Sequence, residues 1–266
     1  MLPTFNGAST VDRALKSVKA QTYKNYEIIV VDHHSTDATV KIAKKYTNKI
    51  YLDKRKLLSS RKIALEKSKG ELIIFLSCDQ VFEPTFFERA VKLFQEGDYD
   101  MAITEERSYK PKTWIEKLTD IDRKRIHEAF ELDPQKSVLL PGVFRKSLLM
   151  KVFKKFSTPL LEHVTIHDHA IIYYECYKLS RKIGVISNAV YHEEPKTTKK
   201  LFGHYYGWGK RSRAVNNILG KEYEQMFANK MSHRLKTIRI FNRDDIAIMP
   251  IVIIKGLGFK LGYYFG

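Results

Sequence analysis

The sequence has little cysteine and no signal-peptide pattern. Of its 266 residues only two are cysteines, Cys78 and Cys176, which is too few for the disulfide framework of a small secreted domain. No positively charged segment followed by an apolar run opens the chain. These absences predict a protein of the reducing cytoplasm.

Two common nucleotide-binding motifs are also missing. The chain has no G-x-x-x-x-G-K-S/T segment, and no G-x-G-x-x-G follows a predicted strand, so ordinary P-loop and dinucleotide-binding folds are disfavoured. Repeats and low-complexity linkers are lacking too. The hydrophobic content of 44%, with 12% aromatic residues, is typical of an ordered globular protein.

Acidic residues are scarce relative to basic ones. The chain has 30 Asp and Glu against 47 Lys and Arg, which gives a formal net charge of +17. Such an excess predicts an anionic partner: nucleic acid, the phosphates of a nucleotide, or an acidic membrane surface. A lysine-rich surface that serves solubility alone is the alternative.

The C-terminal segment lacks an apolar run long enough to cross a membrane. Its uninterrupted apolar part, Ile246 to Ile254, is too short for roughly 30 Å of hydrocarbon, and Lys255 and Lys260 interrupt the rest. Aromatic residues suited to a headgroup interface follow. We therefore predict that residues 246–266 make a monotopic contact with an anionic membrane surface, which places the protein peripherally on the cytoplasmic face. A helix that closes the soluble core or a dimer interface is the alternative.

Strand-like and helix-like patterns alternate over the first hundred residues. This β-α-β-α order indicates a parallel sheet with right-handed crossovers. The first strand has almost no body, because Met1 directly precedes Leu2-Pro3-Thr4, so either this strand is short or the chain begins upstream. The predicted strands are 1–4, 26–32, 50–52 and 71–79, and the predicted helices are 12–20, 38–46 and 59–69.

The pattern is less regular after residue 84. It predicts helices at 85–96, 114–130 and 167–179 and strands at 100–104, 139–145, 183–186 and 190–192. No linker separates these elements, so we expect one catalytic-type domain followed by a basic C-terminal extension.

Carboxylates stand where two predicted strands end. Asp32 follows a β-branched run, and Asp79 follows the apolar run that begins at Glu71. The crevice outside the carboxyl ends of the strands is where open α/β sheets bind ligands, and carboxylates are hard oxygen ligands for Mg²⁺ or Mn²⁺. Arg61, which opens the helix before the second run, could face the same phosphates. The alternative for Asp79 is that it caps the following turn or helix.

Several segments together resemble the GT-A fold glycosyltransferases of family 2. Leu2 to Gly7 is similar to the family's P-T-Y/F-N opening, and Glu27 to Asp37 is similar to E-I-I-V-V-D-D-G-S-T-D. Arg61 and Ala64 match the A-R-N-x-G helix, and Gly70 to Asp79 resembles the G-E-Y-I-x-F-L-D-x-D strand. The resemblance covers about the first 90 residues closely and the second half more loosely, at Pro141 to Arg145, His167-Asp168 and Val190 to His192.

The resemblance implies an α/β fold with a mostly parallel, Rossmann-like sheet flanked by helices and a basic, partly apolar helical extension. Residues 1–200 would form the glycosyltransferase domain, with a nucleotide-sugar half at about 1–105 and an acceptor half at about 106–200, and residues 201–266 the extension. It implies inverting transfer of a sugar from a UDP- or GDP-sugar with Mg²⁺ or Mn²⁺. The implied site residues are Pro3, Asn6, Asp32 and Arg61 on the donor nucleotide, Asp79 and His192 on the metal, and Asp168 as the general base.

The chain departs from the family pattern at three places. Ser77-Cys78-Asp79 stands for D-x-D, so the metal rests on Asp79 with water and His192. Asp32-His33-His34 stands for D-D-G, and His167-Asp168 stands for the acidic pair. The Q-x-x-R-W motif of processive synthases is absent, which favours transfer of a single sugar, and the expected acceptor is lipid-linked or amphiphilic.

Other interpretations remain for several residues. Asp168 is alternatively a helix N-cap, and His192 a core histidine at a strand end. His163, His167 and His169 have a spacing that would place the first two on one helical face, as in a zinc site. Residues 204–211 are either a lid or an ordinary packed helix.

A second function is also open. A non-catalytic protein that binds a nucleotide sugar or nucleic acid on the same scaffold would explain the basic charge and the incomplete D-x-D. No nucleic-acid fold motif is present, so we do not expect a nucleic-acid partner.

Overall fold

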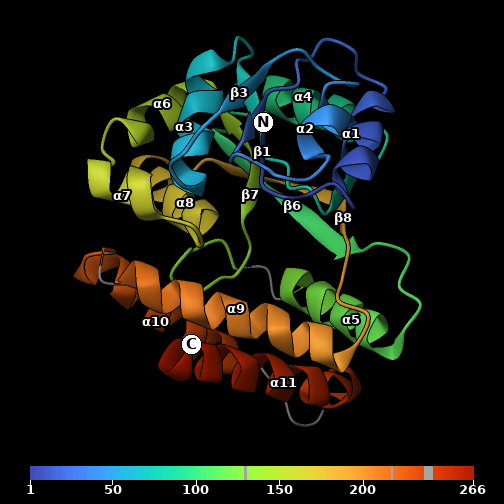
Figure 1. Cartoon of the computed structure of the whole chain (residues 1–266), viewed down its shortest axis with the longest axis vertical. Helices are drawn as coiled ribbons and strands as arrows, with labels where there is room; N and C mark the ends of the chain where they lie inside the picture. Colours follow the sequence, from blue (N-terminus) through green and yellow to red (C-terminus); the bar gives the residue numbers. More distant parts are fainter. Residues whose placement is uncertain (129–130, 217, 237–241) are drawn as a thin grey trace. The chain divides into compact units, whose positions relative to one another are not determined.

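The computed structural model describes residues 1–128, 131–216, 218–236 and 242–266. The chain divides into two compact units. The first unit comprises Met1–Glu105, Leu140–Val164 and Asp168–Tyr191, and the second comprises Glu106–Leu139, Thr165–His167 and His192–Gly266. Figure 1 shows the elements of both.

A parallel sheet of three strands opens the first unit. Its order is β1 (Leu2–Thr4), β2 (Val30–Asp32) and β3 (Ile50–Leu52), with Leu2 opposite Val30 and Val30 opposite Ile50. The β2 residues are all buried, which explains their uninterrupted β-branched run. The crossover helices are α1 (Val11–Lys19), α2 (Thr39–Ala43) and α3 (Leu57–Lys67).

A second sheet has the order β4-β7-β6-β8-β5. In it β7 (Pro141–Arg145) pairs antiparallel with both β4 (Leu72–Ile74) and β6 (Met101–Ser108). Beyond β6 lie β8 (Ile183–His192) and then β5 (Gln80–Phe82), so that β4 and β5 are the edge strands. The predicted α/β fold is confirmed, but the parallel arrangement holds for the first sheet, and β4 pairs antiparallel with a strand from the second half of the chain.

The segment just after β4 bonds to β7 in its own sheet and to the start of the first sheet. The amide of Leu76 donates to the carbonyl of Met1 at 3.0 Å, and the amide of Phe75 donates to the carbonyl of Gly142 at 2.9 Å. Helices α3, α6 (Lys146–Phe153), α7 (Thr158–His163) and α8 (Asp168–Leu179) cover one side, while α1 and α4 (Phe86–Glu96) cover the other (Figure 1).

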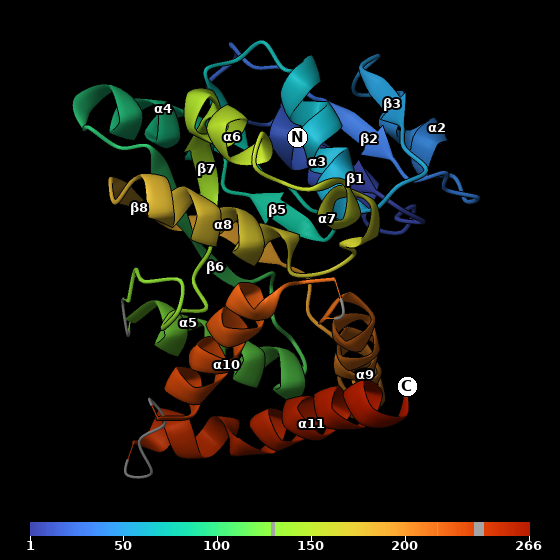
Figure 2. The same cartoon turned by 90° about the vertical axis from the view of Figure 1, so that its left-hand side faces the viewer.

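The second unit is mainly helical. It contains α5 (Trp114–Glu128), α9 (Thr198–Asn216), α10 (Lys221–Lys236) and α11 (Arg243–Phe265), which Figure 2 shows from the side. Glycines let α9 and α11 approach closely: a Cβ added to Gly262 would collide with the carbonyl oxygen of Tyr206, and one added to Gly209 would collide with that of Phe259. The segment 204–211 is part of α9, so the packed-helix alternative is confirmed for it.

Most predicted elements form, with shifted ends. The two predicted strands at 183–186 and 190–192 are one strand, β8, and only the end of the predicted strand 26–32 pairs in β2. Strand β5 and helices α6 and α7 were not predicted. The end of the predicted helix 114–130 lies at residues 129–130, outside the described residues.

Candidate functional site

Asp32 organises the loops at the carboxyl ends of β1 and β2. Its carboxylate is fully buried. Oδ1 accepts hydrogen bonds from the hydroxyls of Thr4 at 2.8 Å and Ser35 at 2.7 Å, and Oδ2 accepts one from the amide of Ser35 at 2.8 Å. The structure therefore shows Asp32 holding two loops together, and its contact with the donor stays a prediction.

Asn6 lies in the loop that Asp32 supports. It is exposed and adopts a left-handed backbone conformation, with φ of 46°. Its amide donates to the Ser35 hydroxyl at 2.8 Å, and its side-chain oxygen accepts from the amide of Thr36 at 2.9 Å. Both the P-T-F-N segment and the D-H-H-S-T-D segment thus contribute to one shaped edge.

An aromatic pair to which the sequence motifs gave no role stands at the same edge. Phe5 is 60% exposed, and its ring contacts that of His33 edge-on at 5.6 Å between centroids. Nδ1 of His33 is 2.8 Å from the carbonyl oxygen of Asp53, which holds the imidazole in place. The signal in the sequence that could have found this pair is an aromatic residue, Phe5, in the polar segment before Asn6 and a histidine, His33, directly after Asp32.

The pKa of the Cys78 thiol reflects the negative charge at this edge. Burial, followed by the nearby charges of Asp79, Asp32 and Asp37, raises the pKa of the Cys78 thiol to about 12. The thiol is packed under the opening loop, because a Cβ added to Gly7 would lie 3.1 Å from its sulfur. A thiol with this pKa stays neutral and is no nucleophile. Three carboxylates close to one buried group make a place where a cation would be stabilised.

Asp79 itself is half-buried, in the turn between β4 and β5. The ladder of β4 ends at Ile74, so Asp79 does not directly end a strand of the parallel sheet as expected, and follows an extended segment instead. The carboxylate of Asp37 is already used, since it accepts from the amides of Thr39 at 3.0 Å and Ala8 at 3.1 Å. The role of Asp79 as a metal ligand on this edge stays a prediction.

A preformed metal cage is not present among the described residues, where no group of three or more His, Cys, Asp or Glu side chains could hold an ion. The residues do fit a cation that arrives with a diphosphate, because Mg²⁺ is usually held by one or two carboxylates together with substrate phosphates and water. His192 ends β8 and belongs to the second unit, so its part in the metal shell stays a prediction.

Arg61 and Asp168 form a buried ion pair in the first unit. Nε of Arg61, on α3, donates to Oδ2 of Asp168, the first residue of α8. The two side chains are only 4% and 7% exposed. The guanidinium also lies over the ring of Phe75, with Cζ 4.2 Å from its centroid. The structure therefore brings together the predicted phosphate-binding arginine and the predicted general base.

One nitrogen of Arg61, the buried Nη1, has no hydrogen-bond acceptor among the described residues. A buried donor without an acceptor costs about 1–3 kcal/mol, so an anionic ligand oxygen at this position would be stabilised.

The three histidines of the alternative zinc site, His163, His167 and His169, do not form a cluster. His163 ends α7, and His167 lies outside both neighbouring helices with φ of 65°. The ring of His167 instead contacts the hydroxyl of Ser212 at 2.7 Å, and Nε2 of His169 contacts the carbonyl oxygen of Pro141. The prediction that His163 and His167 share a helical face is wrong.

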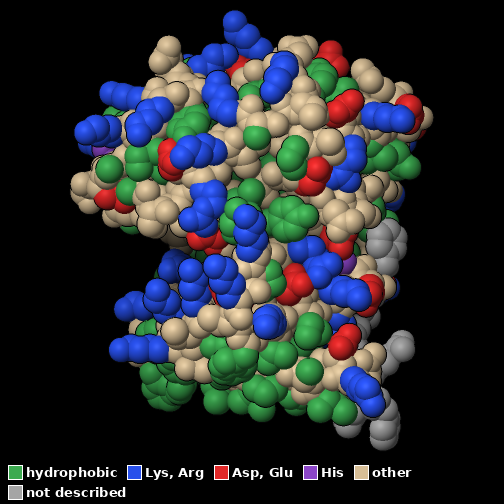
Figure 3. Space-filling view, turned by 90° about the vertical axis from the view of Figure 1, so that its right-hand side faces the viewer, with side chains coloured by type: hydrophobic (Ala, Val, Ile, Leu, Met, Phe, Trp, Pro, Cys, Tyr) green, Lys and Arg blue, Asp and Glu red, His purple; other side chains and the backbone are tan. Residues whose placement is uncertain are grey.

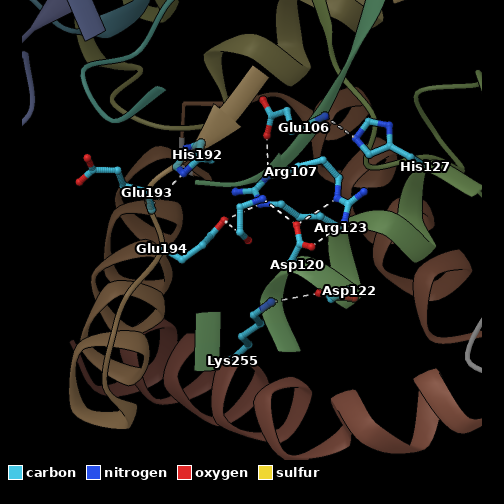
Figure 4. Close-up of polar contacts among 11 residues, drawn as sticks. Glu106, Arg107, Asp120, Asp122, Arg123, His127, His192, Glu193, Glu194 and Lys255 are labelled. Carbon is cyan, nitrogen blue, oxygen red and sulfur yellow. Dashed lines mark hydrogen bonds and ion pairs between the residues drawn. The ribbon is translucent and has the colours of Figure 1, made fainter. Parts of the chain in front are cut away.

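A cluster of charged side chains forms polar contacts within the second unit (Figure 4). Arg123 pairs with Glu106 and Glu194, at 2.5 Å each, and Arg107 pairs with Asp120. Burial lowers the pKa of Arg123, but the two carboxylates outweigh it and raise the pKa above its usual value. These ion pairs join β6, α5 and the segment after β8 within the second unit.

An α/β unit with a shaped, negative edge at the carboxyl ends of its strands and a buried arginine nearby has the features of a nucleotide-binding transferase. The chain belongs to the glycosyl transferase family 2, whose model matches residues 1–171. The prediction of the family is therefore confirmed.

Individual relatives match shorter stretches. An uncharacterized glycosyltransferase of Rickettsia typhi is 36% identical over 101 residues, which cover 37% of this chain and 32% of the relative. A cholesterol galactosyltransferase of Borreliella burgdorferi is 39% identical over 90 residues, which cover 32% of this chain and 25% of the relative. The chain thus spans about a third or less of the length of these curated relatives.

Solved structures share the fold over most of the chain. TarS of Staphylococcus aureus aligns with a TM-score of 0.57 at 18% identity, covering 99% of this chain and 80% of that one, and it has also been solved with UDP-GlcNAc. Glucosyl-3-phosphoglycerate synthase of Mycobacterium tuberculosis, solved with Mn²⁺ and UDP, aligns with a TM-score of 0.56 at 16% identity, covering 80% of this chain and 76% of that one.

Proposed function

We propose that this protein is an inverting glycosyltransferase that moves a single sugar from a UDP-sugar to an amphiphilic or lipid-linked acceptor. The observation that carries the proposal is the buried pair of Arg61 and Asp168, in which Nη1 of Arg61 has no acceptor among the described residues. A carboxylate held beside a guanidinium with a spare donor suits a reaction that needs a base and a stabiliser of phosphate charge.

The donor nucleotide would bind at the edge formed by the loops after β1 and β2. Pro3, Asn6 and Asp32 shape this edge, and the exposed ring of Phe5 offers a flat surface for a base. The UDP-GlcNAc complex of TarS and the UDP complex of the mycobacterial synthase support uridine over guanosine as the base.

The metal would be held by Asp79 together with the donor diphosphate. Mg²⁺ or Mn²⁺ bound there would neutralise charge on the leaving nucleotide. The negative surroundings of Cys78 support this position, and the Mn²⁺ complex of the mycobacterial synthase supports the choice of ion. His192 is the proposed further ligand, tested by whether His192→Ala raises the Mn²⁺ concentration needed for activity.

In the reaction, Asp168 would take the proton of the acceptor hydroxyl as its oxygen attacks the anomeric carbon. The ion pair with Arg61 orients the carboxylate of Asp168. Arg61 would stabilise the departing diphosphate through its spare nitrogen. No covalent intermediate on the protein is needed.

The test is UDP release from UDP-sugars with Mn²⁺. Asp168→Asn should lower the turnover rate by about 10²-fold or more, the range of a lost general base, and Asp79→Ala should also lower it and raise the metal requirement. Asp98→Asn is the matched control, because Asp98 is 82% exposed and its carboxylate pairs with the surface side chain of Lys182. Undiminished activity in both site variants would refute these roles. Binding of UDP-sugar without release or transfer would favour the non-catalytic alternative.

A membrane contact by α11 is the second part of the proposal. Side chains at a helical spacing of three or four residues form an exposed apolar stripe on this helix: Ile246, Met249, Ile253, Leu257, Leu261 and Tyr264. Figure 3 shows hydrophobic side chains gathered over the lower part of the molecule, with Lys and Arg bordering them. We name these six residues the α11 stripe.

The opposite side of α11 argues against a spanning helix. Although the helix has 23 residues and is apolar enough to cross a membrane, Lys255 is buried on its inner side, where Nζ lies 3.0 Å from Oδ2 of Asp122. Gly258 and Gly262 pack on α9. A helix bound to its own protein on one side and apolar on the other is suited to lie in the membrane interface.

Flotation with liposomes tests this contact. Ile253→Gln with Leu257→Gln should abolish co-flotation with anionic vesicles, while Lys54→Gln, a charge change in the first unit, should lower it only slightly. Unchanged flotation of the double variant would refute the membrane contact. A sedimentation coefficient that falls to that of a monomer in the double variant, without any flotation of the wild type, would favour the dimer interface.

A further inference from the structure

The charged side chains of helix α9 are all positive. They are Lys199, Lys200, Lys210, Arg211 and Arg213. No Asp or Glu occurs between Glu194 and Glu222, so the helix and its flanking residues contain no acid. Such a helix cannot balance its charge by the i,i+4 pairs of opposite sign that stabilise solvated helices. A surface with charge of one sign attracts ligands of the opposite sign.

One side of α9 is turned away from its neighbour α11 (Figure 1). Gly209 marks the packed side, because a Cβ added there would collide with the carbonyl oxygen of Phe259 on α11. With 3.6 residues per turn, the opposite side carries four exposed side chains at a spacing of three or four residues. These four, which we name the α9 face, are Lys200, His204, Trp208 and Arg211.

Aromatic neighbours hold the indole of Trp208 in the α9 face. Its ring centroid lies 5.4 Å from that of His204, 5.7 Å from that of Tyr205 and 6.2 Å from that of His167. Trp208 is nevertheless 37% exposed. An indole that is fixed by its neighbours and still open to solvent offers a flat apolar surface, which suits the C–H side of a sugar ring.

The guanidinium of Arg211 lies back along α9, over Gly207. A Cβ added to Gly207 would find Nη1 of Arg211 as its nearest neighbour, at 3.3 Å, and one added to Gly203 would meet nothing within 4 Å. Burial lowers the pKa of Arg211, and no nearby carboxylate counteracts this shift. The α9 face therefore combines a partly desolvated guanidinium with bare helix backbone, which a ligand can approach closely.

We propose that the α9 face binds a phosphorylated sugar, with the phosphate on Arg211 and the sugar ring on Trp208. A guanidinium binds phosphate through two parallel hydrogen bonds, and the charge of Lys200 on the same face adds to the attraction. Inorganic phosphate would leave the indole unused, and a neutral sugar would leave the guanidinium unused. That the bound sugar phosphate is part of the acceptor rests on the proposed function.

A membrane surface fits the α9 face less well. The α11 stripe lies on the side of α11 opposite to Gly258 and Gly262, which pack on α9. The α9 face in turn lies on the side of α9 opposite to Gly209. The two surfaces are thus on opposite sides of the helix pair, and a bilayer that contacts the α11 stripe does not reach Arg211.

Isothermal titration calorimetry of the full chain with glucose 6-phosphate tests the proposal. UDP and Mn²⁺ are present in excess, so that the sugar phosphate does not bind at the proposed donor site. Arg211→Gln should raise the dissociation constant at least about tenfold through loss of the charged hydrogen bonds, and Trp208→Leu at least about threefold through loss of the ring. Glucose and inorganic phosphate should each bind at least about tenfold more weakly than glucose 6-phosphate.

Arg213→Gln is the matched control. It removes the same charge from the same helix, but Nη1 of Arg213 donates to the carbonyl oxygen of Tyr264 at 3.1 Å, on the α11 side. Because a charge on the far side of the helix is screened by salt, this variant should change the dissociation constant by less than about twofold. Asp168→Asn should bind glucose 6-phosphate as the wild type does, although it loses the general base of the proposed reaction.

Four results would overturn the proposal. They are no binding of glucose 6-phosphate by the wild type, equal affinities in Arg211→Gln and Arg213→Gln, and inorganic phosphate that binds as tightly as glucose 6-phosphate. The fourth is an Arg211→Gln variant that keeps its affinity for glucose 6-phosphate but no longer floats with anionic vesicles, which would assign the α9 face to lipid headgroups. A wild type that releases UDP without binding glucose 6-phosphate would refute this inference alone and leave the proposed function standing.

Discussion

The buried pair of Lys255 and Asp122 offers a sharp test of how α11 is held in the second unit. The side chains are 9% and 2% exposed, and Nζ lies 3.0 Å from Oδ2. Breaking such a pair from one side costs about 3–5 kcal/mol, because a buried charge loses its partner. Arg125 also contacts Asp122, at 3.3 Å, so we expect Lys255→Met to cost about 3 kcal/mol, at the lower end of that range.

Urea unfolding followed by tryptophan fluorescence measures this cost. The two tryptophans, Trp114 and Trp208, both belong to the second unit, so the signal reports on that unit. The control is Lys260→Met, an exposed position on the same helix, which should change the free energy of unfolding by less than about 0.5 kcal/mol.

A double-mutant cycle then isolates the pair. Adding Asp122→Asn to Lys255→Met removes the buried charge along with its partner, so the loss in the double variant should be smaller than the sum of the single losses by about 1–3 kcal/mol. If Lys255→Met matches Lys260→Met in stability, or if the single losses simply add, the buried ion pair does not hold α11 and the orientation of the α11 stripe loses its support.

Three further outcomes follow from the described contacts. Gly262→Val should destabilise the second unit by about 1–3 kcal/mol through overpacking. Gly256→Ala is the control and should not destabilise it, because a Cβ added there meets nothing within 4 Å. Equal unfolding midpoints of the two variants would contradict the close packing of α9 and α11. The free energy of unfolding should fall as the pH rises above about 9. In the unfolded chain the Cys78 thiol has its ordinary pKa of 9.0 and loses its proton there, whereas in the folded chain its pKa is about 12 and it keeps the proton, so the unfolded state binds fewer protons. A Cys78→Ala variant with the same alkaline slope would contradict this. Arg61→Lys keeps the charge but loses the planar fork, so UDP release should drop at least tenfold, measured against the exposed change Arg13→Lys, and equal rates in both variants would contradict the assigned role.

The sequence predicted the first sheet and its edge well because their signals are local. A β-branched run before Asp32, a polar loop and a following helix lie within a dozen residues, and their order alone indicates a parallel unit. The spacing of the apolar residues in the α11 stripe can also be read from the sequence, but the side of α11 that packs on α9 cannot.

Pairings between distant residues could not be predicted in this way. β7 inserts beside β4 from about seventy residues further along the chain, and nothing in the period of either strand encodes that choice. The ion pair of Arg61 and Asp168 joins residues 107 positions apart. The helix at 114–130 could be predicted, but the pairing of its Arg123 with Glu106 and Glu194 depends on tertiary packing.

The most direct test of the proposed donor site is a thermal-shift measurement of the full chain with UDP, GDP and ATP, each with and without Mn²⁺. UDP with Mn²⁺ at about 100 times its dissociation constant should stabilise the fold by about 2.7 kcal/mol, and the stabilisation should shrink without the metal and in Asp79→Ala, but persist in Asp98→Asn. A melting temperature that no nucleoside diphosphate moves, or an equal shift in Asp79→Ala and wild type, would contradict a nucleotide-sugar site at this edge of the sheet.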